Sequence, residues 1–313
     1  MLTRKTFALV KVEAEYGVDP GLTVDDMLAL TNASGTRYGG NTVERTRMRP
    51  TLGAYAQINA GPNAQVTLTL PLKSSGTPGT VPECGPLLRA CGHSETVTAD
   101  DGNGTGKVDY QPVSEGFESV TVYWVTDNQV QRMTGCRGTS TFNLTAGAEP
   151  TIEVALTGAY NRPEAFTLDG EYEEIAFEVP VNKQNTGEFT VHGYEGCGQS
   201  LTITTNNTVS WRNLINCQGA HITDRQASGQ VNIEAPDLAT KDYFAEVESH
   251  QQVKRGPIKL VHGLEPGNIF EFNAPAAQLS SISDQDQDGY VHWQMDARFL
   301  PVTGDDEYVL TFR

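Results

Sequence analysis

The clearest candidate for a chemical site is a run of alternating acidic residues near the C-terminus. Asp284, Asp286 and Asp288 alternate with glutamines and precede Gly289. This is how a calcium-binding loop begins, because oxygen ligands alternate there and glycine permits the sharp turn. Such a loop also needs a bidentate glutamate at its twelfth position, where this chain has Met295. We therefore favour an exposed acidic turn between strands over a calcium site.

No other group of side chains has the spacing of a catalytic or metal-binding motif. The six histidines are scattered and the five cysteines include no Cys-x-x-Cys pair, so neither a metal cluster nor a disulfide framework is predicted. The glycine-rich segment 102–106 lacks the strand, helix and lysine of a phosphate-binding loop. We predict a protein that is not an enzyme and that uses no cofactor and no metal.

Composition indicates a folded, loop-rich β protein. The 313 residues are 38% hydrophobic and 19% charged and include 31 glycines and 16 prolines, a profile unlike that of a disordered chain. The length suggests two domains of ordinary size. No export signal opens the chain, and no apolar run approaches the roughly 18 residues of a membrane helix. We expect a protein that stays in the cytoplasm in which it is made.

The net charge of −17 lies mainly in the second half of the chain. Residues 1–160 hold 16 acidic and 12 basic side chains, whereas residues 161–313 hold 23 acidic and 10 basic ones. Tight nucleic-acid binding depends on Lys and Arg that displace condensed counterions. The charge therefore argues against a protein that holds nucleic acid firmly.

One sequence pattern occurs twice. Gln65–Pro71 reads QVTLTLP and Gln230–Pro236 reads QVNIEAP, and similar elements follow each copy in the same order. Repeats near 150 residues indicate a duplicated domain rather than a solenoid unit. We predict a first β domain at residues 51–162 and a second at residues 163–313, each with one short helix.

Hydrophobic alternation and turn residues define the elements of each half. In the first half they predict a strand at Ala64–Leu72, a helix at Pro82–Cys91, and strands at Ser119–Trp124, Val130–Cys136, Thr139–Leu144 and Thr151–Thr157. In the second half they predict a strand at Ser228–Ala235, a helix at Asp237–Ser249 capped by Asp237, a hairpin within Ile258–Asn273, and strands at Tyr290–Phe299 and Tyr308–Phe312.

Residues 1–50 have the pattern of an arm rather than of a core, because turn residues interrupt them repeatedly. The arm ends in a small basic cluster, Arg45, Arg47 and Arg49. Residues at alternate positions share one face of an extended strand. Two interpretations stay open: a solvated edge strand, or an arm that contacts an acidic patch on a neighbouring copy or ring.

A wider resemblance rests on four segments that follow one another along the chain. They are Ala8–Pro20, Gly85–Gly92, Gly116–Val122 and Arg298–Pro301. Together they resemble the tail tube proteins, or major tail proteins, of long-tailed bacteriophages and their prophage relatives. The resemblance spans most of the chain.

This resemblance implies a mainly β fold of two tandem β-sandwich or barrel domains, each with a flanking helix. It implies a structural virion protein of a long non-contractile tail, built in the host cytoplasm, whose rings stack into a hollow tube. Two domains per chain fit a homotrimer with pseudo-sixfold symmetry, with a homohexamer as the alternative. The implied partners are tail terminator, tape measure and tail-tip proteins, while double-stranded DNA passes through without tight binding.

Acidic residues that alternate with apolar neighbours are our candidates for the wall of the bore. They are Glu153, Glu234, Glu271 and Asp296. An acidic wall repels the phosphates of DNA, whereas a basic wall would hold them. The competing interpretation is a tail-tip or adhesin-type β-sandwich that contacts the host surface.

Overall fold

The computed structural model describes residues 2–170, 172 and 178–313. The chain is mainly β, with 52% of residues in strands and 6% in helices. The predicted fold class is confirmed, and each half carries one short α-helix. The strands form large antiparallel sheets, which do not close into a barrel over the described part of the chain. Within the described residues, no helix is both long and apolar enough to cross a membrane.

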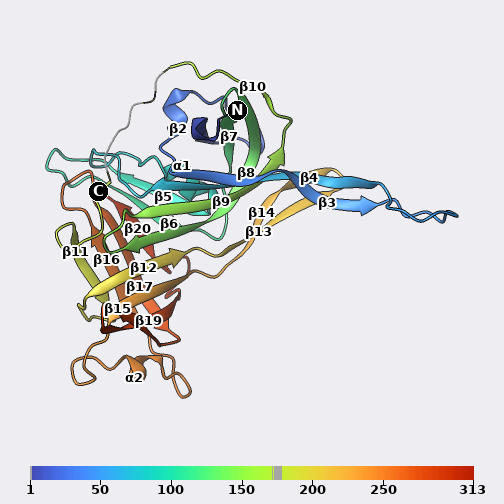
Figure 1. The fold of residues 1–313 in the computed structure, drawn as a ribbon. Coiled ribbons are helices and arrows are strands. Elements are labelled where there is room, and N and C mark those ends of the chain that lie inside the picture. Colours follow the sequence, from blue (N-terminus) through green and yellow to red (C-terminus); the bar gives the residue numbers. More distant parts are fainter. Residues whose placement is uncertain (1, 171, 173–177) are drawn as a thin grey trace.

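The elements follow one another along the chain as labelled in Figure 1. The helices are the 3-10 turns η1 (Thr3–Lys5) and η2 (Val24–Asp26) and the α-helices α1 (Gly85–Ala90) and α2 (Tyr243–Val247). The strands of the first half are β1 (Thr6–Val12), β2 (Met27–Leu28), β3 (Asn32–Glu44), β4 (Gln57–Pro71), β5 (His93–Thr98), β6 (Lys107–Pro112), β7 (Val120–Thr126), β8 (Gln129–Thr145), β9 (Thr151–Tyr160) and β10 (Glu164–Ala165). Those of the second half are β11 (Thr186–Val191), β12 (Gly198–Thr204), β13 (Asn207–Leu214), β14 (Cys217–Arg225), β15 (Ser228–Glu234), β16 (Gly256–His262), β17 (Phe270–Leu279), β18 (Ser283–Gln287), β19 (Tyr290–Phe299) and β20 (Val309–Phe312).

Eight antiparallel strands form one continuous sheet, which we call the wall. Its order is β3–β4–β9–β8–β12–β15–β19–β18. The first four strands come from the first half of the chain and the last four from the second half. Pairing between β8 and β12 joins the two groups. No strand within the described residues pairs with the outer edge of β3 or of β18.

The two halves pair their strands in the same order. In the first half the order is β1–β7–β8–β9–β4–β3. In the second half it is β11–β16–β17–β19–β15–β12. The first half adds the β5–β6 hairpin, which joins the second half through β20. The strands outside the wall cover its apolar face: β1 and β7 in the first half and β11, β16 and β17 in the second half contribute side chains to the core.

A large hydrophobic core runs under the wall through both halves. Leu9, Tyr123, Val125 and Val130 form a separate, smaller cluster. Phe142 of β8 stacks on Phe270 of β17 with ring centroids 5.9 Å apart, although these strands do not pair. The contact therefore crosses from the wall to the covering layer. Helix α2 lies at the far end of the core, where the ring centroids of Phe244 and of Trp293 in β19 are 5.2 Å apart. Burying aromatic rings of this size dominates the energetics of such a core.

Most predicted strands are confirmed, but two of them form one strand. Val130–Cys136 and Thr139–Leu144 both belong to β8, which continues through a bulge between Thr134 and Arg137. Gly135 takes a positive φ of 63° there, a conformation that glycine adopts at little cost. The prediction of two strands was wrong because β8 does not end at Cys136: Arg137 and Gly138, where the break was placed, pair with Thr157 and Leu156 of β9.

The second helix is shorter than predicted. It spans Tyr243–Val247 rather than Asp237–Ser249, and its cap is Asp242, whose side chain accepts a hydrogen bond from the Ala245 amide at 3.0 Å. Asp237 instead closes a separate turn through its own carbonyl, which accepts from the Thr240 amide. Two aspartates can each begin a helix here, and the sequence alone did not decide between them.

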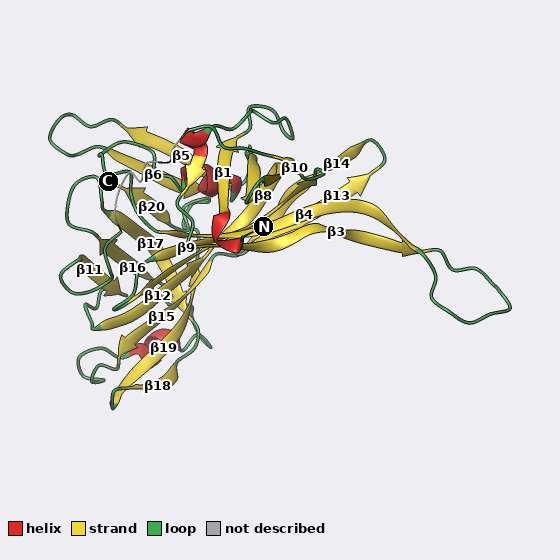
Figure 2. Cartoon of the chain, turned by 45° about the horizontal axis from the view of Figure 1, so that its top comes forward, coloured by secondary structure: helices red, strands yellow, loops and turns green. Residues whose placement is uncertain are grey.

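The first fifty residues are only partly an arm. Strand β1 lies in the sheet beside β7, and Ala8, Leu9 and Val10 are almost fully buried. The projecting part is the β3–β4 hairpin, which reaches far beyond the rest of the molecule in Figures 1 and 2.

Candidate assembly surface

One face of the wall is polar. Side chains directly opposite one another on neighbouring strands share a face, so the face can be followed in rows. One row is Asn32, Thr69, Glu153, Thr141, Thr204, Ser228 and Arg298. The next rows are Thr151, Asn143, Thr202, Gln230 and Asp296, and then Thr145, Ser200, Asn232, Gln294 and Ser283. We call these residues, together with Glu234 of β15, the polar face.

The alternate residues of the same strands are apolar and buried. Val66, Leu68, Ile152, Val154, Phe142, Leu144, Leu201, Ile203, Val231, Ile233 and Met295 are each at most 1% exposed. A period of two with one buried side is the signature of a sheet that packs on a core and faces water. The polar face is therefore a solvent-exposed surface shared by both halves of the chain.

Three of the four predicted wall acids lie on the polar face. Glu153 and Asp296 are exposed and Glu234 is half-buried. Asp296 accepts hydrogen bonds from Ser281 Oγ at 2.7 Å and from Gln230 Nε2 at 3.0 Å, and these bonds lower the pKa of its carboxyl. It is therefore charged at neutral pH. The remaining side chains of the rows are mainly neutral hydroxyls and amides, with Arg298 as the one cation.

The fourth acid, Glu271, lies elsewhere. It belongs to β17, whose Phe270 faces the wall across the core. Because neighbouring residues of a strand point to opposite sides, Glu271 points away from the wall. It forms ion pairs with Lys259 Nζ at 3.7 Å and with Arg313 Nε at 3.4 Å.

The three arginines lie in the loop between β3 and β4, residues 45–56, which we call the arginine loop. The hydrogen bond from the Arg45 amide to the Ala56 carbonyl closes the hairpin, and the residues between them are not in a strand. Arg49 folds back over the Tyr55 ring at 4.5 Å, so the three side chains do not share one strand face as predicted. Met48 and Leu52 are fully exposed, at 106% and 103%.

A second hairpin runs beside the first. Strands β13 and β14 continue β12 and β15 outward and lie alongside β3 and β4 (Figure 2). Asn213 Nδ2 donates to the Ala60 carbonyl at 2.6 Å and links the two hairpins. The second hairpin turns at Ile215 and Asn216, and Ile215 is 94% exposed. Both hairpins thus present apolar side chains at their tips.

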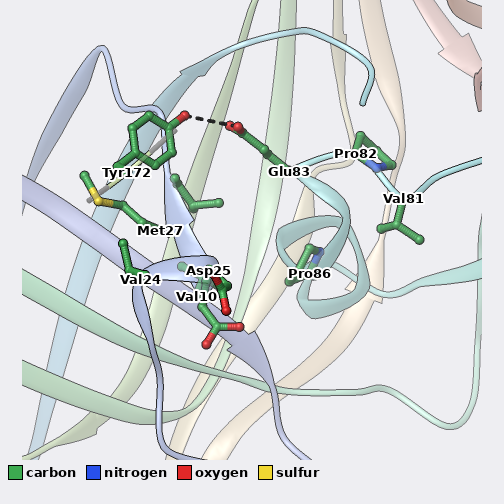
Figure 3. Close-up of a pocket in the computed structure, with 11 residues that line it drawn as sticks. Val10, Val24, Asp25, Met27, Val81, Pro82, Glu83, Pro86 and Tyr172 are labelled. Atoms are coloured by element: carbon green, nitrogen blue, oxygen red, sulfur yellow. Dashed lines mark hydrogen bonds between the residues drawn. The ribbon is translucent and has the colours of Figure 1, made fainter. Parts of the chain in front are cut away.

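A cavity of about 460 Å³ lies between η2, β2 and the start of α1 (Figure 3). Two of its acids have partners: Asp26 pairs with Lys11 at 3.2 Å, and Glu83 accepts from Tyr172 Oη at 3.1 Å. Lys73 Nζ also lies 3.8 Å from Glu83. These contacts tie η2 to β1 and Glu83 to Lys73 and Tyr172.

A buried carboxylate that sequence reasoning missed fixes the β8 bulge. Glu13, 8% exposed, accepts hydrogen bonds from Thr121 Oγ1 and the Gly135 amide, each at 2.7 Å, and from the Gly17 amide at 2.8 Å. Buried charges need such partners. Glu13 therefore ties the segment after β1 to the bulge.

A buried histidine ties the two halves. His93, 3% exposed, shares a hydrogen bond of 2.8 Å with the Tyr308 hydroxyl and one of 2.9 Å with the Leu88 carbonyl. Burial lowers its pKa to about 4, so the ring is neutral at pH 7.

The acidic run near the C-terminus is part of the wall. Residues 283–287 form the edge strand β18, and only Asp288 and Gly289 make the turn into β19. The prediction placed the whole run in a turn, whereas its first residues pair with β19. Within the described residues, no cluster of His, Cys, Asp and Glu has the geometry of a metal site. The cysteines are all free, with Cys197 and Cys217 exposed.

The two unpaired edges of the wall expose backbone donors and acceptors that another strand can pair. In a comparison of the sequence with protein families, the model of the phage tail tube protein family matches residues 3–289, so the chain belongs to that family. No curated protein matches the chain. The resemblance to tail tube proteins is confirmed, although the match ends before the fourth segment, Arg298–Pro301. The family makes this chain a structural component of a phage virion.

Proposed function

We propose that this chain is the repeating subunit of the tail tube, that its copies close into rings, and that stacked rings form the channel for DNA between capsid and host. The observation that carries this proposal is the wall: eight strands, four from each half, with a polar face and two free edges. Free edges of this length expose backbone donors and acceptors that another copy can pair.

We further infer a tandem duplication with a boundary near Arg162 and Pro163. The equal strand orders of the two halves support it, as does the place of the repeated segments, which lie in β4 and β15 at the same position in each order. The second domain is residues 163–313. The first is residues 51–162, to which we now add β1 because it pairs with β7.

Ring size follows from strand number. Three chains supply about 24 wall strands, and barrels of about 16 to 18 strands already enclose an aqueous channel. A homotrimer with pseudo-sixfold symmetry is therefore our preferred ring, and a homohexamer is the alternative. We place the protein in a long non-contractile tail that is built in the host cytoplasm, with tail terminator, tape measure and tail-tip proteins at its ends and along its bore.

The polar face lines the proposed bore. Glu153, Glu234 and Asp296 lie on it together with neutral side chains, and such a surface has few cations to displace the counterions of DNA. DNA then slides without adhering. Glu271 is left out of this lining because it points away from the wall.

Arg45, Arg47 and Arg49, with Met48 and Leu52, are the proposed contact to a neighbouring ring or subunit. Loops that project this far beyond their own core gain stability only from a partner, since they bury little within the chain.

Negative-stain electron microscopy of the purified protein tests the proposal. We expect stackable rings or long hollow tubes. Monomers that bind host-surface glycans would contradict it and would favour an adhesin. The bore is tested by tubes of the triple variant Glu153→Lys, Glu234→Lys, Asp296→Lys, which should retain duplex DNA at low salt and release it at high salt. Equal DNA retention by unsubstituted tubes would contradict a non-adhering bore.

A further inference from the structure

The chain already contains one finished joint between its two groups of wall strands. Strand β8 pairs with β12 over Thr141–Thr145 and Ser200–Thr204. On the buried side Phe142 lies opposite Ile203, and on the polar side Asn143 lies opposite Thr202. Backbone pairing and a continuous core therefore seal this joint.

The outer edge of β18 is the counterpart of the β8 edge at that joint. In the first half Thr69 lies opposite Glu153, which lies opposite Thr141. In the second half Glu234 lies opposite His292, which lies opposite Gln285. Thr69 and Glu234 occupy the same position in the repeated segments. Thr141 thus corresponds to Gln285, and Asn143 corresponds to Gln287.

The outer edge of β3 is likewise the counterpart of the β12 edge. Thr36 lies opposite Gln65, and Thr202 lies opposite Gln230. Gln65 and Gln230 open the two copies of the repeated segment, so Thr36 corresponds to Thr202. Each half therefore offers the same pair of edges, and only one edge of each kind is used inside the chain.

We propose that β18 of one copy pairs antiparallel with β3 of the next, in the register of the β8–β12 joint, so that Gln287 lies opposite Thr36. This rests on the proposed ring of copies and specifies how that ring closes. The wall then continues from chain to chain with the same joint at every step.

Charge at the two edges fits this pairing. In the proposed register Asp286 lies opposite Arg37. Asp286 is exposed and belongs to a strand with a second acid, Asp284. Arg37 lies over the Trp124 ring at 3.9 Å and donates to Thr126 Oγ1 at 2.8 Å. Among the described residues neither Arg37 nor Asp286 has an ion-pair partner, so a second copy supplies the opposite charge to both.

Exposure at the open edge points the same way. Ile152 lies opposite Phe142 and both are fully buried. Their counterparts Val291 and Asp286 lie opposite each other in β19 and β18, and Val291 is 55% exposed. An apolar side chain left open where its counterpart is covered indicates a surface that a partner covers.

Paired cysteines test the register directly. Cα atoms of directly opposite residues lie about 4.5–5.5 Å apart, within the range that a disulfide bridges. In a Cys197→Ser, Cys217→Ser background, chains carrying Thr36→Cys are mixed with chains carrying Gln287→Cys, assembled and oxidised. We expect a cross-linked dimer on a non-reducing gel. Dithiothreitol should reduce its disulfide and return the chains to monomers.

Two controls frame that result. The pair Asn143→Cys with Thr202→Cys in one chain reports the finished joint and should cross-link within the chain. Chains with Asn32→Cys mixed with Gln287→Cys place the thiols four residues out of register and should cross-link at least tenfold less.

The outcomes separate this proposal from the function on which it rests. Cross-linking at the Thr36 pair well above the Asn32 pair supports the register. Rings or tubes visible by microscopy with no preference for the Thr36 pair would overturn the pairing and leave the tube function standing. Protein that never assembles in any background would overturn both.

Discussion

The joint inside the chain and the open ends of the wall use corresponding strands that carry different side chains. At the β8–β12 joint the positions facing the core hold Phe142 and Ile152, both fully buried. At the β18 edge the corresponding positions hold Asp286 and the half-exposed Val291. A joint made once during folding can be apolar, whereas an unpaired edge in water is commonly blunted by charged side chains.

The two projecting hairpins differ in a similar way. The second turns at Ile215 and Asn216, while the first carries the whole arginine loop, residues 45–56. Corresponding hairpins of the two halves thus end in connections of very different length. In our account one half of the chain is specialised for closing the ring and the other for reaching beyond it.

Removing the arginine loop is the strongest test of this difference between the two hairpins. We replace residues 46–55 by Asn-Gly, which forms a tight hairpin turn and gives the first hairpin a short end like that of the second. The free energy of unfolding should change by less than about 0.5 kcal/mol, because the loop is exposed. Tubes should no longer elongate, as measured by their length distribution in electron micrographs.

The matched control for that variant keeps the charge. Substitution of lysine for Arg45, Arg47 and Arg49 retains three cations on a loop of native length, and tubes should still form. If the shortened chain formed tubes of native length, the arginine loop would not be needed for tube assembly.

A core substitution compares the finished joint with the open edge. Phe142→Ala should lower the free energy of unfolding by about 3–5 kcal/mol, because it leaves a cavity in the packed joint. Asp286→Ala, at the corresponding position, should change it by less than about 0.5 kcal/mol. Urea denaturation of the dispersed protein measures both. Equal losses would show that β18 is not an open counterpart of β8.

Mild acid should weaken the tie between the halves. The pKa of His93 falls from 6.5 to about 4 on folding because the ring is buried. Between these values the unfolded chain binds a proton that the folded chain does not, so stability falls as the pH falls from 6.5 towards 4. The loss from this group is on the order of 3 kcal/mol. His93→Gln should flatten the dependence measured by urea midpoints at several pH values, and an unchanged slope would contradict it.

The smallest effect concerns the cap of α2. Asp242→Ala should cost about 1 kcal/mol, since its side chain caps the helix through the Ala245 amide. Asp237→Ala is the control and should cost little, because Asp237 acts through its backbone carbonyl. Thermal melting of the two variants compares them, and a larger loss for Asp237→Ala would favour the longer helix.

Alternation and turn residues predicted most strands of this fold. The hairpin of β16 and β17 and the strand Tyr290–Phe299 were located correctly because their apolar residues alternate strictly. The β8 bulge was missed, since Gly135 and its neighbours break the alternation locally while Glu13 holds the backbone in place from more than a hundred residues away. Such long-range hydrogen bonds leave no local pattern.

The candidate site was predictable residue by residue but not as a surface. Glu153, Glu234 and Asp296 were selected by alternation and share one face, yet Glu271 alternates equally well and points the other way. Alternation shows that a residue is on the polar side of its own strand, and only the pairing of strands shows which layer that strand joins. The free edges of β3 and β18 could not be foreseen for the same reason.

A cryo-electron microscopy reconstruction of the assembled protein tests the central claim most directly. Our account predicts a hollow tube in which the wall strands of neighbouring copies run continuously around the bore, with Glu153, Glu234 and Asp296 lining it. A map that places these three side chains at subunit contacts or on the outer surface, or wall strands that end at unpaired edges, would contradict it.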